Sequence, residues 1–275
     1  SACGKNLSTE LTSTIGVQRR ENYALLAPDR ETFVELVTEG QPPAPGYFVH
    51  DATLNKQVRA LMDETALPDP MSWEQVQVAL ASGALLVDGR DPVDFARGHL
   101  QGAINVGLAG RYAEFAGSVV PVDADVVLFV EPGSELEAKN RLGRIGFDRV
   151  LGYVDQPFHV LQDHRDRVGV ASRLTPIELR QRQLELAELQ LVDVRNPGEF
   201  ALGAVPDAIN IPVGQLPGRL AELDPQLPTV VYCAGGYRSS VAASLLRARG
   251  FADVSDVAGG YGAWTQVLAM TDPRP

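Results

Sequence analysis

Residues 191–210 read LVDVRNPGEFALGAVPDAIN, and residues 86–105 read LVDGRDPVDFARGHLQGAIN. Each stretch begins with a short apolar run that ends in Asp, and Arg, Pro, Phe and Asn then follow at the same spacing. The offset between the stretches is 105 residues (191 minus 86), and the Gly-Phe pair at 250–251 answers the one at 146–147 at nearly the same offset. A period this long exceeds that of solenoid repeats. The chain therefore contains two copies of one domain.

The same order of elements is predicted in each copy. A helix is followed by a strand, a second strand, a second helix and a third short strand. The predicted helices cover 71–82 and 175–187, then 135–145 and 239–249; the predicted strands cover 84–87 and 189–192, then 126–130 and 229–232, with the last ones near 150 and 254. Short apolar strands alternating with helices indicate an α/β fold whose parallel sheet is covered on both faces. Ligands of such folds bind beyond the carboxyl ends of the strands.

Composition limits the kind of protein. The chain of 275 residues is 45% hydrophobic and carries a net charge of −11, which argues against nucleic acid and against anionic membranes as partners. No apolar run approaches the ~20 residues that span a bilayer, and no signal peptide is apparent at residue 1. The two cysteines, Cys3 and Cys233, lie at opposite ends of the chain. A disulfide framework is therefore not expected, and the sequence predicts a cytoplasmic protein.

Cys233 opens the stretch CAGGYRSS, residues 233–240, directly after the predicted strand 229–232. The adjacent Gly235 and Gly236 permit a tight loop that turns backbone N–H groups inward. We expect Ser239 to cap the following helix, whose positive end then points at the loop. Such surroundings lower a cysteine pKa from ~8.5 to ~3.5–7.5. The sequence therefore predicts a reactive thiolate at Cys233, with Arg238 supplying a fixed positive charge and donors for an oxyanion.

These residues carry a family resemblance. The loop 233–239 is similar to the active-site loop of rhodaneses, and the stretch 192–212 and the closing GGYGAW at 259–264 resemble their other two signatures. The resemblance implies two domains with five-stranded parallel sheets. It also implies a catalytic Cys233 that carries sulfur as a persulfide, and Asp193 and Arg195 as structural support. The implied substrate-binding residues are Ala234, Gly235, Gly236, Tyr237, Arg238 and Ser239. Two departures, Ala204 where the family commonly has His and Asp207 where it commonly has Gly, leave local packing and turn geometry open.

Three other functions compete with sulfur transfer. Phosphatases and arsenate reductases of the tyrosine-phosphatase type keep five residues between Cys and Arg, whereas Cys233 and Arg238 are separated by four. A Cys–His protease pair within the second copy is excluded because no His occurs after residue 164. A non-catalytic binding scaffold is the second hypothesis, and the intact loop 233–239 argues against it.

The first copy lacks the nucleophile. The repeat offset aligns Cys233 with Leu128 or Phe129, and matching the strand ends aligns it with Val130. The arginine is also missing, and Pro132 removes one backbone donor. This copy resembles an inactive rhodanese domain, in which we interpret His99 as a structural residue.

Residues 1–67 stand outside the repeat, and two predicted rhodanese-like domains follow at 71–165 (inactive) and 173–271 (active). The N-terminal segment resembles the tail of a metallo-β-lactamase-fold hydrolase, so the whole resembles the C-terminal part of a bacterial persulfide dioxygenase–rhodanese fusion. No cofactor or metal is expected in this chain, and Fe(II) is expected only with the missing hydrolase-fold domain. The implied partners are a sulfur donor, thiosulfate or glutathione persulfide, and a thiol or cyanide acceptor. A homo-oligomer is compatible with the sequence.

Overall fold

A computed structural model describes residues 12–39, 44–59 and 62–271, and the side chains of residues 268–271 are not described. The chain divides into two units, with the division between Pro43 and Ala44. Each unit is described by itself. Cys3 lies outside the described residues.

The first unit contains two short helices, α1 (Ile15–Glu21) and α2 (Arg30–Thr38). Each begins at a side-chain cap, since Thr14 accepts from the N–H of Val17 and Asp29 from that of Thr32. Neither of these two helices buries a residue. Without buried apolar side chains, the described part of this unit has no core of its own.

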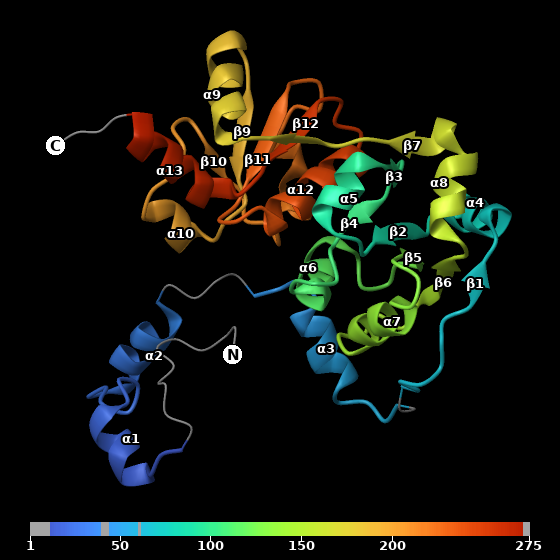
Figure 1. The fold of residues 1–275 in the computed structure, drawn as a ribbon. Helices are drawn as coiled ribbons and strands as arrows, with labels where there is room; N and C mark the ends of the chain where they lie inside the picture. Colours follow the sequence, from blue (N-terminus) through green and yellow to red (C-terminus); the bar gives the residue numbers. More distant parts are fainter. Residues whose placement is uncertain (1–11, 40–43, 60–61, 272–275) are drawn as a thin grey trace. The chain divides into compact units, whose positions relative to one another are not determined.

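The second unit contains two five-stranded parallel sheets of the same topology (Figure 1). Their strand orders are β1-β6-β5-β2-β4 and, read from the other edge, β8-β12-β11-β9-β10. The first sheet comprises β1 (Pro70–Met71), β2 (Leu85–Asp88), β4 (Ile104–Asn105), β5 (Val126–Phe129) and β6 (Val150–Val154). The second comprises β8 (Ser172–Leu174), β9 (Gln190–Asp193), β10 (Ile209–Asn210), β11 (Thr229–Tyr232) and β12 (Val254–Val257). The predicted duplication and the α/β fold class are confirmed.

Helices surround both sheets. In the first copy they are α4 (Trp73–Ala81), α5 (Pro92–Arg97), α6 (Tyr112–Val119), α7 (Glu135–Gly143) and α8 (Pro157–Asp163). In the second they are α9 (Pro176–Glu185), α10 (Pro197–Ala201), α11 (Leu216–Arg219), α12 (Tyr237–Ala248) and α13 (Gly260–Thr271). A short antiparallel pair, β3 (His99–Leu100) with β7 (Val168–Gly169), and two 3-10 turns at Arg165–Arg167 and Leu220–Glu222 complete the unit.

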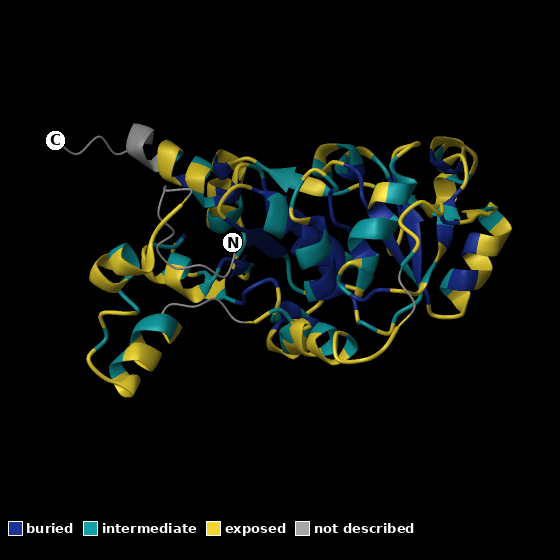
Figure 2. Cartoon of the chain, turned by 90° about the horizontal axis from the view of Figure 1, so that it is seen from below, coloured by how far each residue is buried: buried dark blue, intermediate teal, exposed yellow. Residues whose placement is uncertain are grey.

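Strand and helix formation follow from the local sequence. Every residue of β5 and of β11 is buried, as expected for central parallel strands covered on both faces. The first helix of each copy starts at a capping box, Ser72 with Gln75 and Thr175 with Glu178. Figure 2 shows that the strands are buried, whereas the outer surfaces of the helices are exposed. None of the helices in the described ranges is long and apolar enough to cross a membrane.

The two copies share one hydrophobic core. Helix α12 contacts its own strands β11 and β12 and also β4 and α6 of the first copy, and all residues from Ser239 to Leu246 are buried. Asn105 at the end of β4 receives a hydrogen bond from Ser240 Oγ (2.7 Å), and its N–H donates to Ser244 Oγ (2.8 Å). Side chains of both copies belong to the same cluster around this helix. Two smaller clusters lie on the outer faces of the sheets.

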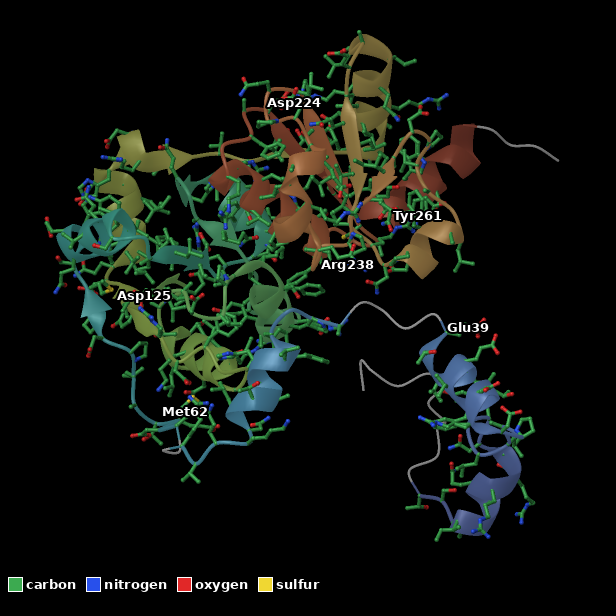
Figure 3. The ribbon with its side chains drawn as sticks, turned by 180° about the vertical axis from the view of Figure 1, so that it is seen from behind. Glu39, Met62, Asp125, Asp224, Arg238 and Tyr261 are labelled. Atoms are coloured by element: carbon green, nitrogen blue, oxygen red, sulfur yellow. The ribbon has the colours of Figure 1, made fainter. Side chains whose placement is uncertain are left out.

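Residues 44–67 pack on the first copy as far as they are described. Helix α3 (Phe48–Leu54) follows Tyr47, whose ring is buried in the shared core. Glu64 forms an ion pair with Arg144 (3.0 Å) at the end of α7, and Met62 lies over the same helix (Figure 3). The domain boundary after residue 67 stays a prediction.

Candidate active site

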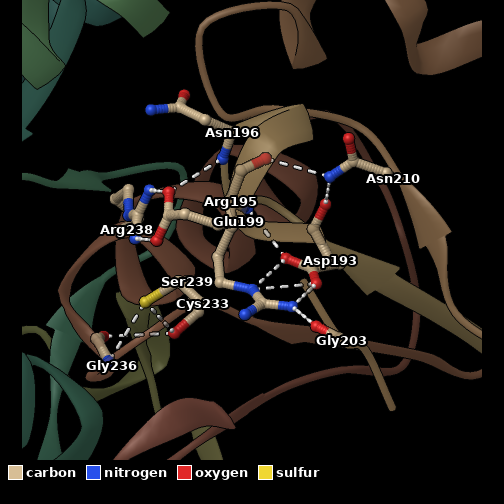
Figure 4. A network of polar contacts seen from close by, with 10 residues as sticks. All are labelled: Asp193, Arg195, Asn196, Glu199, Gly203, Asn210, Cys233, Gly236, Arg238 and Ser239. Atoms are coloured by element: carbon tan, nitrogen blue, oxygen red, sulfur yellow. Dashed lines mark hydrogen bonds and ion pairs between the residues drawn. The ribbon is translucent and has the colours of Figure 1, made fainter. Parts of the chain in front are cut away.

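Cys233 lies at the carboxyl end of β11, the central strand of the second sheet. Its side chain is only 1% exposed. The N–H of Gly236 donates to Sγ at 3.1 Å, and Sγ lies 3.6 Å from Ser239 Oγ, which in turn donates to the carbonyl of Gly236 at 3.2 Å (Figure 4). The sulfur is therefore held at the bottom of a tight loop by one backbone donor and one hydroxyl.

The start of α12 differs from the sequence expectation. The helix begins at Tyr237 with Gly236 as its N-cap residue, not at Ser239. Gly236 has a φ of 103°, a left-handed conformation that glycine adopts without strain, and this lets the chain turn into the helix two residues early. Ser239 consequently lies in the first turn, buried, with its hydroxyl directed at the Cys233 loop. The predicted capping role of Ser239 is wrong.

The first turn of α13 supports the loop from the other side. The N–H of Tyr261 donates to the Cys233 carbonyl at 2.7 Å, and the N–H of Gly262 donates to the Ala234 carbonyl at 3.1 Å. A Cβ on Gly260 would lie 2.2 Å from the Cys233 carbonyl oxygen, so only glycine allows this approach. Ala234 and Gly235 are exposed. The closing GG stretch at 259–260 thus fixes the backbone that carries the thiol.

Arg238 is held by Glu199. Its two terminal nitrogens donate to the two carboxylate oxygens at 2.6 and 2.7 Å, and Glu199 also accepts from the N–H of Asn196 (Figure 4). The hydrogen bonds from Arg238 lower the pKa of Glu199, and those to Glu199 raise the pKa of Arg238, which the Cys233 sulfur raises further. The arginine therefore carries a fixed charge beside Sγ, but the terminal nitrogens of its guanidinium face Glu199 and not an open anion site.

Asp193 and Arg195 form a buried ion pair at 2.6 Å at the end of β9. Arg195 also donates to the Gly203 carbonyl at 2.7 Å, and Asn210 Nδ2 donates to the carbonyls of both pair members. The first copy repeats this arrangement with Asp88, Arg90, Gly98 and Asn105. Because the copy without a thiol keeps the network, its geometry supports a structural role for Asp193 and Arg195.

A cavity of about 550 Å³ opens above Cys233 and is lined by both copies. Of the substrate-binding residues predicted from the sequence, Gly235, Tyr237 and Arg238 line it, whereas Gly236 and Ser239 contact Sγ instead. The remaining lining residues are Asn196 and Glu199 of the second copy and Gly110, Arg111 and Phe115 of the first. The three first-copy residues were not predicted. Arg111 precedes Cys233 by 122 residues (233 minus 111), so no local motif joins them.

Tyr237 reaches across to the first copy. Its hydroxyl donates to the Gly107 carbonyl at 2.6 Å, and its ring lies 5.5 Å from that of Phe115. A Cβ on Gly110 would lie 2.3 Å from the Tyr237 ring, so glycine is required at this contact. Burial raises the pKa of Tyr237, which keeps the hydroxyl protonated as a donor. The tyrosine therefore joins the Cys233 loop to the first copy.

Strand register identifies what the first copy has in place of the thiol. Phe129 pairs with Asp88 as Tyr232 pairs with Asp193, so Val130 occupies the position of Cys233. The alignment by strand ends is thus confirmed, and the offsets that gave Leu128 or Phe129 are wrong. Val130 is buried and has no nucleophilic group.

Ala204 and Asp207, the two unusual residues of the second copy, differ in their structural consequences. His99 of the first copy stacks on Phe95 at 3.8 Å, with Nδ1 2.9 Å from the Phe95 carbonyl, and Ala204 replaces it in the second. Asp207 has a φ of 64°, as Gly102 has a φ of 83° in the first copy, so the turn keeps its left-handed residue without glycine.

The residues described do not fit an iron site. Among them, no group of three or more His, Cys, Asp or Glu side chains could hold a metal ion. His50 lies 3.3 Å from the Gly146 carbonyl and is engaged with the first copy. We therefore derive no step through iron in this chain.

Comparison with known proteins gives matches to each copy. The family described as Rhodanese-like domain matches twice, over residues 72–155 and 175–267. A sulfurtransferase of Allochromatium vinosum is 36% identical over 88 residues, which cover 32% of this chain and 82% of that protein. Thiosulfate sulfurtransferase GlpE of Pseudomonas aeruginosa is 34% identical over 95 residues, which cover 34% of this chain and 84% of the relative. The crystal structure of a rhodanese-like domain protein from Staphylococcus aureus is 36% identical and covers 34% of this chain and 90% of that chain, with a TM-score of 0.32.

Proposed function

This chain belongs to the family of rhodanese-like domains, and we propose that its second copy transfers sulfane sulfur through a persulfide on Cys233. The observation that carries the proposal is the position of Sγ, held by the Gly236 N–H at 3.1 Å below a cavity of about 550 Å³. Sulfurtransferase activity in general is supported by the family and by relatives that carry this name. Our proposed donors are thiosulfate or a persulfide such as glutathione persulfide, and the acceptors a thiol or cyanide.

The proposed reaction has two steps. The Cys233 thiolate attacks the outer sulfur of the donor, a new S–S bond forms, and the donor's own S–S bond breaks. The electron pair of the broken bond leaves with sulfite when thiosulfate is the donor, or with the thiolate when a persulfide is the donor. An acceptor thiolate or cyanide then attacks the outer sulfur of the Cys233 persulfide. This step releases a new persulfide or thiocyanate and regenerates the thiolate, so no external oxidant or reductant is needed.

The surrounding groups suit a negatively charged sulfur. The N–H of Gly236 and the start of the 12-residue helix α12 both place positive potential at Sγ. The Ser239 hydroxyl, 3.6 Å away, can rotate to donate to the thiolate or to the inner sulfur of the persulfide. Arg238 adds a full positive charge whose orientation Glu199 fixes. These groups stabilise the anion before and after each transfer.

The site favours sulfur transfer over phosphate chemistry and over a non-catalytic scaffold. A phosphatase or arsenate reductase needs free donors for three oxyanion atoms, whereas both terminal nitrogens of Arg238 bind Glu199. A pure scaffold has no need of the nucleophile at the end of β11.

The decisive experiment is the intact mass of the chain after incubation with thiosulfate and, separately, with glutathione persulfide. We expect the gain of one sulfur atom, reversed by cyanide or by a reductant. Cys233→Ser should abolish this gain, and Cys3→Ser, which removes the chain's other thiol, should leave it intact. If neither donor adds sulfur and the chain hydrolyses a phosphate ester instead, phosphate chemistry replaces the proposal. If neither reaction occurs, a scaffold replaces it.

A finer part of the proposal concerns the whole protein. We propose that residues 1–67 continue a hydrolase-fold domain that oxidises persulfide with Fe(II), so that oxidation and sulfur transfer are coupled. Its support is the sequence resemblance of that segment. The test is oxygen consumption by the natural full-length product with glutathione persulfide. Consumption that is lost with a chelator supports the coupling, and absence of consumption refutes it.

A further inference from the structure

The cavity above Cys233 is completed by the inactive first copy, which contributes Gly110, Arg111 and Phe115 to its lining. We propose that Arg111 binds an anionic group of the sulfur donor, so that the copy without a nucleophile selects the substrate of the copy that has one. This inference rests on the proposed function. The inferred substrates are sulfur donors that carry a negative charge at a distance from the sulfur that is transferred.

The two arginines of the cavity differ in how their charges are engaged. Arg238 is bound by both oxygens of Glu199, and its side chain is 18% exposed. Among the described residues, Arg111 forms an ion pair within its own helix turn, with Glu114 three residues on, and its side chain is 55% exposed. Exposed pairs of this type contribute only about 0–1 kcal/mol. A ligand anion can therefore replace or share Glu114, whereas displacing Glu199 from Arg238 would break a bidentate pair.

The position of Arg111 relative to Cys233 is fixed by the interface between the copies. Arg141 of α7 donates to the carbonyls of Leu108 and Gly110 at 2.5 and 2.7 Å, which holds the loop that precedes Arg111. Tyr237, the residue before Arg238, donates to Gly107 in the same loop. The loop of the first copy and the Cys233 loop are thus joined by hydrogen bonds. The guanidinium of Arg111 lies over the ring of Phe115, 5.7 Å from its centre, which directs it along the cavity wall.

The size of the cavity favours a donor larger than thiosulfate. Its volume of about 550 Å³ lies within the roughly 300–1,000 Å³ range of small-molecule sites. An ion of five heavy atoms occupies about 150 Å³ if each atom takes roughly the volume of a water molecule. Phe115, Asn196 and Arg111 are among the residues that line the rest of this space. A small-thiol persulfide with a carboxylate on its organic part matches this combination of an apolar wall and a cation.

Two carboxylates, Glu199 in the cavity lining and Glu114 beside Arg111, are already engaged in ion pairs. Glu199 is bound by Arg238 and by the Asn196 N–H, and Glu114 is bound by Arg111. Arg111 is also the N-cap residue of α6, where the positive end of that helix begins. The first copy therefore adds the positive end of α6 and a second arginine to a site whose own arginine already binds Glu199.

The experiment compares the rate of sulfur loading on Cys233 among three donors. Glutathione persulfide carries carboxylates, thiosulfate carries its charge on a compact sulfonate, and 2-hydroxyethyl persulfide has an uncharged organic part. For Arg111→Gln we expect KM for glutathione persulfide to rise about tenfold with little change in kcat, which corresponds to about 1.4 kcal/mol. We expect 2-hydroxyethyl persulfide to be unaffected and Arg111→Lys to recover most of the loss. A rise in KM confined to thiosulfate would identify its sulfonate as the bound anion and would overturn the inferred substrate class.

A matched control is Arg97→Gln. Arg97 pairs with Asp94 three residues before it on α5, as Arg111 pairs with Glu114, but it does not line the cavity of Cys233. Unchanged kinetics of Arg111→Gln with both anionic donors, while the wild-type chain loads sulfur, would overturn the role of Arg111 and leave the proposed function standing. Equal losses with all three donors would also overturn it, because they would indicate a structural defect. Absence of loading in the wild type would refute the proposed function itself.

Discussion

At the residue scale, His99 shows how an inactive copy can still govern stability. The side chain is buried on the ring of Phe95, and burial, opposed by the hydrogen bond to the Phe95 carbonyl, lowers its pKa to about 4 from the usual 6.5. The folded protein therefore keeps this imidazole neutral at pH values where the unfolded chain protonates it. Its contribution to stability is complete above pH 6.5 and is lost as the pH falls through about 4.

We predict that lowering the pH from 7 to 5 costs the wild type about 2 kcal/mol through His99 alone, because one pKa unit corresponds to about 1.4 kcal/mol. The measurement is urea unfolding at both pH values for the wild type and His99→Gln. The variant should be less stable at pH 7 but should lose about 2 kcal/mol less on acidification. His159→Gln, at an exposed position bonded to Gln156, is the control and should keep the wild-type slope. Parallel pH dependences in the wild type and His99→Gln would contradict the assignment.

At the scale of elements, helix α12 is the feature on which both the fold and the site depend. It begins at the Cys233 loop, and its buried residues from Ser239 to Leu246 contact both copies. The hydroxyl of Tyr237 ties its first residue to Gly107. The docking of α12 therefore sets the distance between the thiol and the lining residues of the first copy.

Tyr237→Phe should lower the free energy of unfolding by about 1 kcal/mol, the usual net contribution of a partly buried hydrogen bond. The phenyl ring would keep its contacts with Phe115 and Gly110, so the loss isolates the bond to the Gly107 carbonyl. The measurement is the urea midpoint of the variant compared with that of Tyr153→Phe, on β6. A midpoint equal to that of the wild type would show that this bond does not hold the helix.

Long, buried elements were predictable from the sequence. The strands at 126–130 and 229–232 and the helices around 135–145 and 239–249 were found within one to two residues, because apolar runs and helical spacing specify them locally. The two-residue strands β4 and β10 carry too little pattern to be recognised, and their pairing depends on β2 and β9. The start of α12 was misplaced because the left-handed Gly236, not the side chain of Ser239, begins the helix.

Those parts of the site that consist of consecutive residues were predictable from the sequence. The loop around Cys233 was identified from consecutive residues, whereas Arg111 enters the cavity only because α12 packs against α6. The partner of Arg238 was likewise missed, since Glu199 lies 39 residues earlier in the chain. Contacts between distant segments follow from the packing of the two copies, which no short motif encodes.

At the scale of the whole second unit, the shared core predicts that the two copies unfold together. The chain's two tryptophans report on them separately, since Trp73 lies in α4 of the first copy and Trp264 in α13 of the second. We expect Leu179→Ala, a fully buried site on α9, to cost about 2–5 kcal/mol. Each tryptophan is followed alone, Trp73 in a Trp264→Phe background and Trp264 in a Trp73→Phe background. We expect Leu179→Ala to lower the urea midpoint of unfolding by the same amount in both backgrounds. A shift confined to the Trp264 signal would show that the copies unfold independently.

The shared helix also has a consequence for synthesis. The sheet of the first copy is complete once β6 has been synthesised at Val154, but α12, which covers this copy, ends at Ala248, 94 residues later (248 minus 154). At about 5–20 residues per second, the ribosome needs roughly 5 to 19 s for that stretch. During this interval the nascent first copy presents an apolar surface without its cover, so we expect the chain to be most prone to aggregation then.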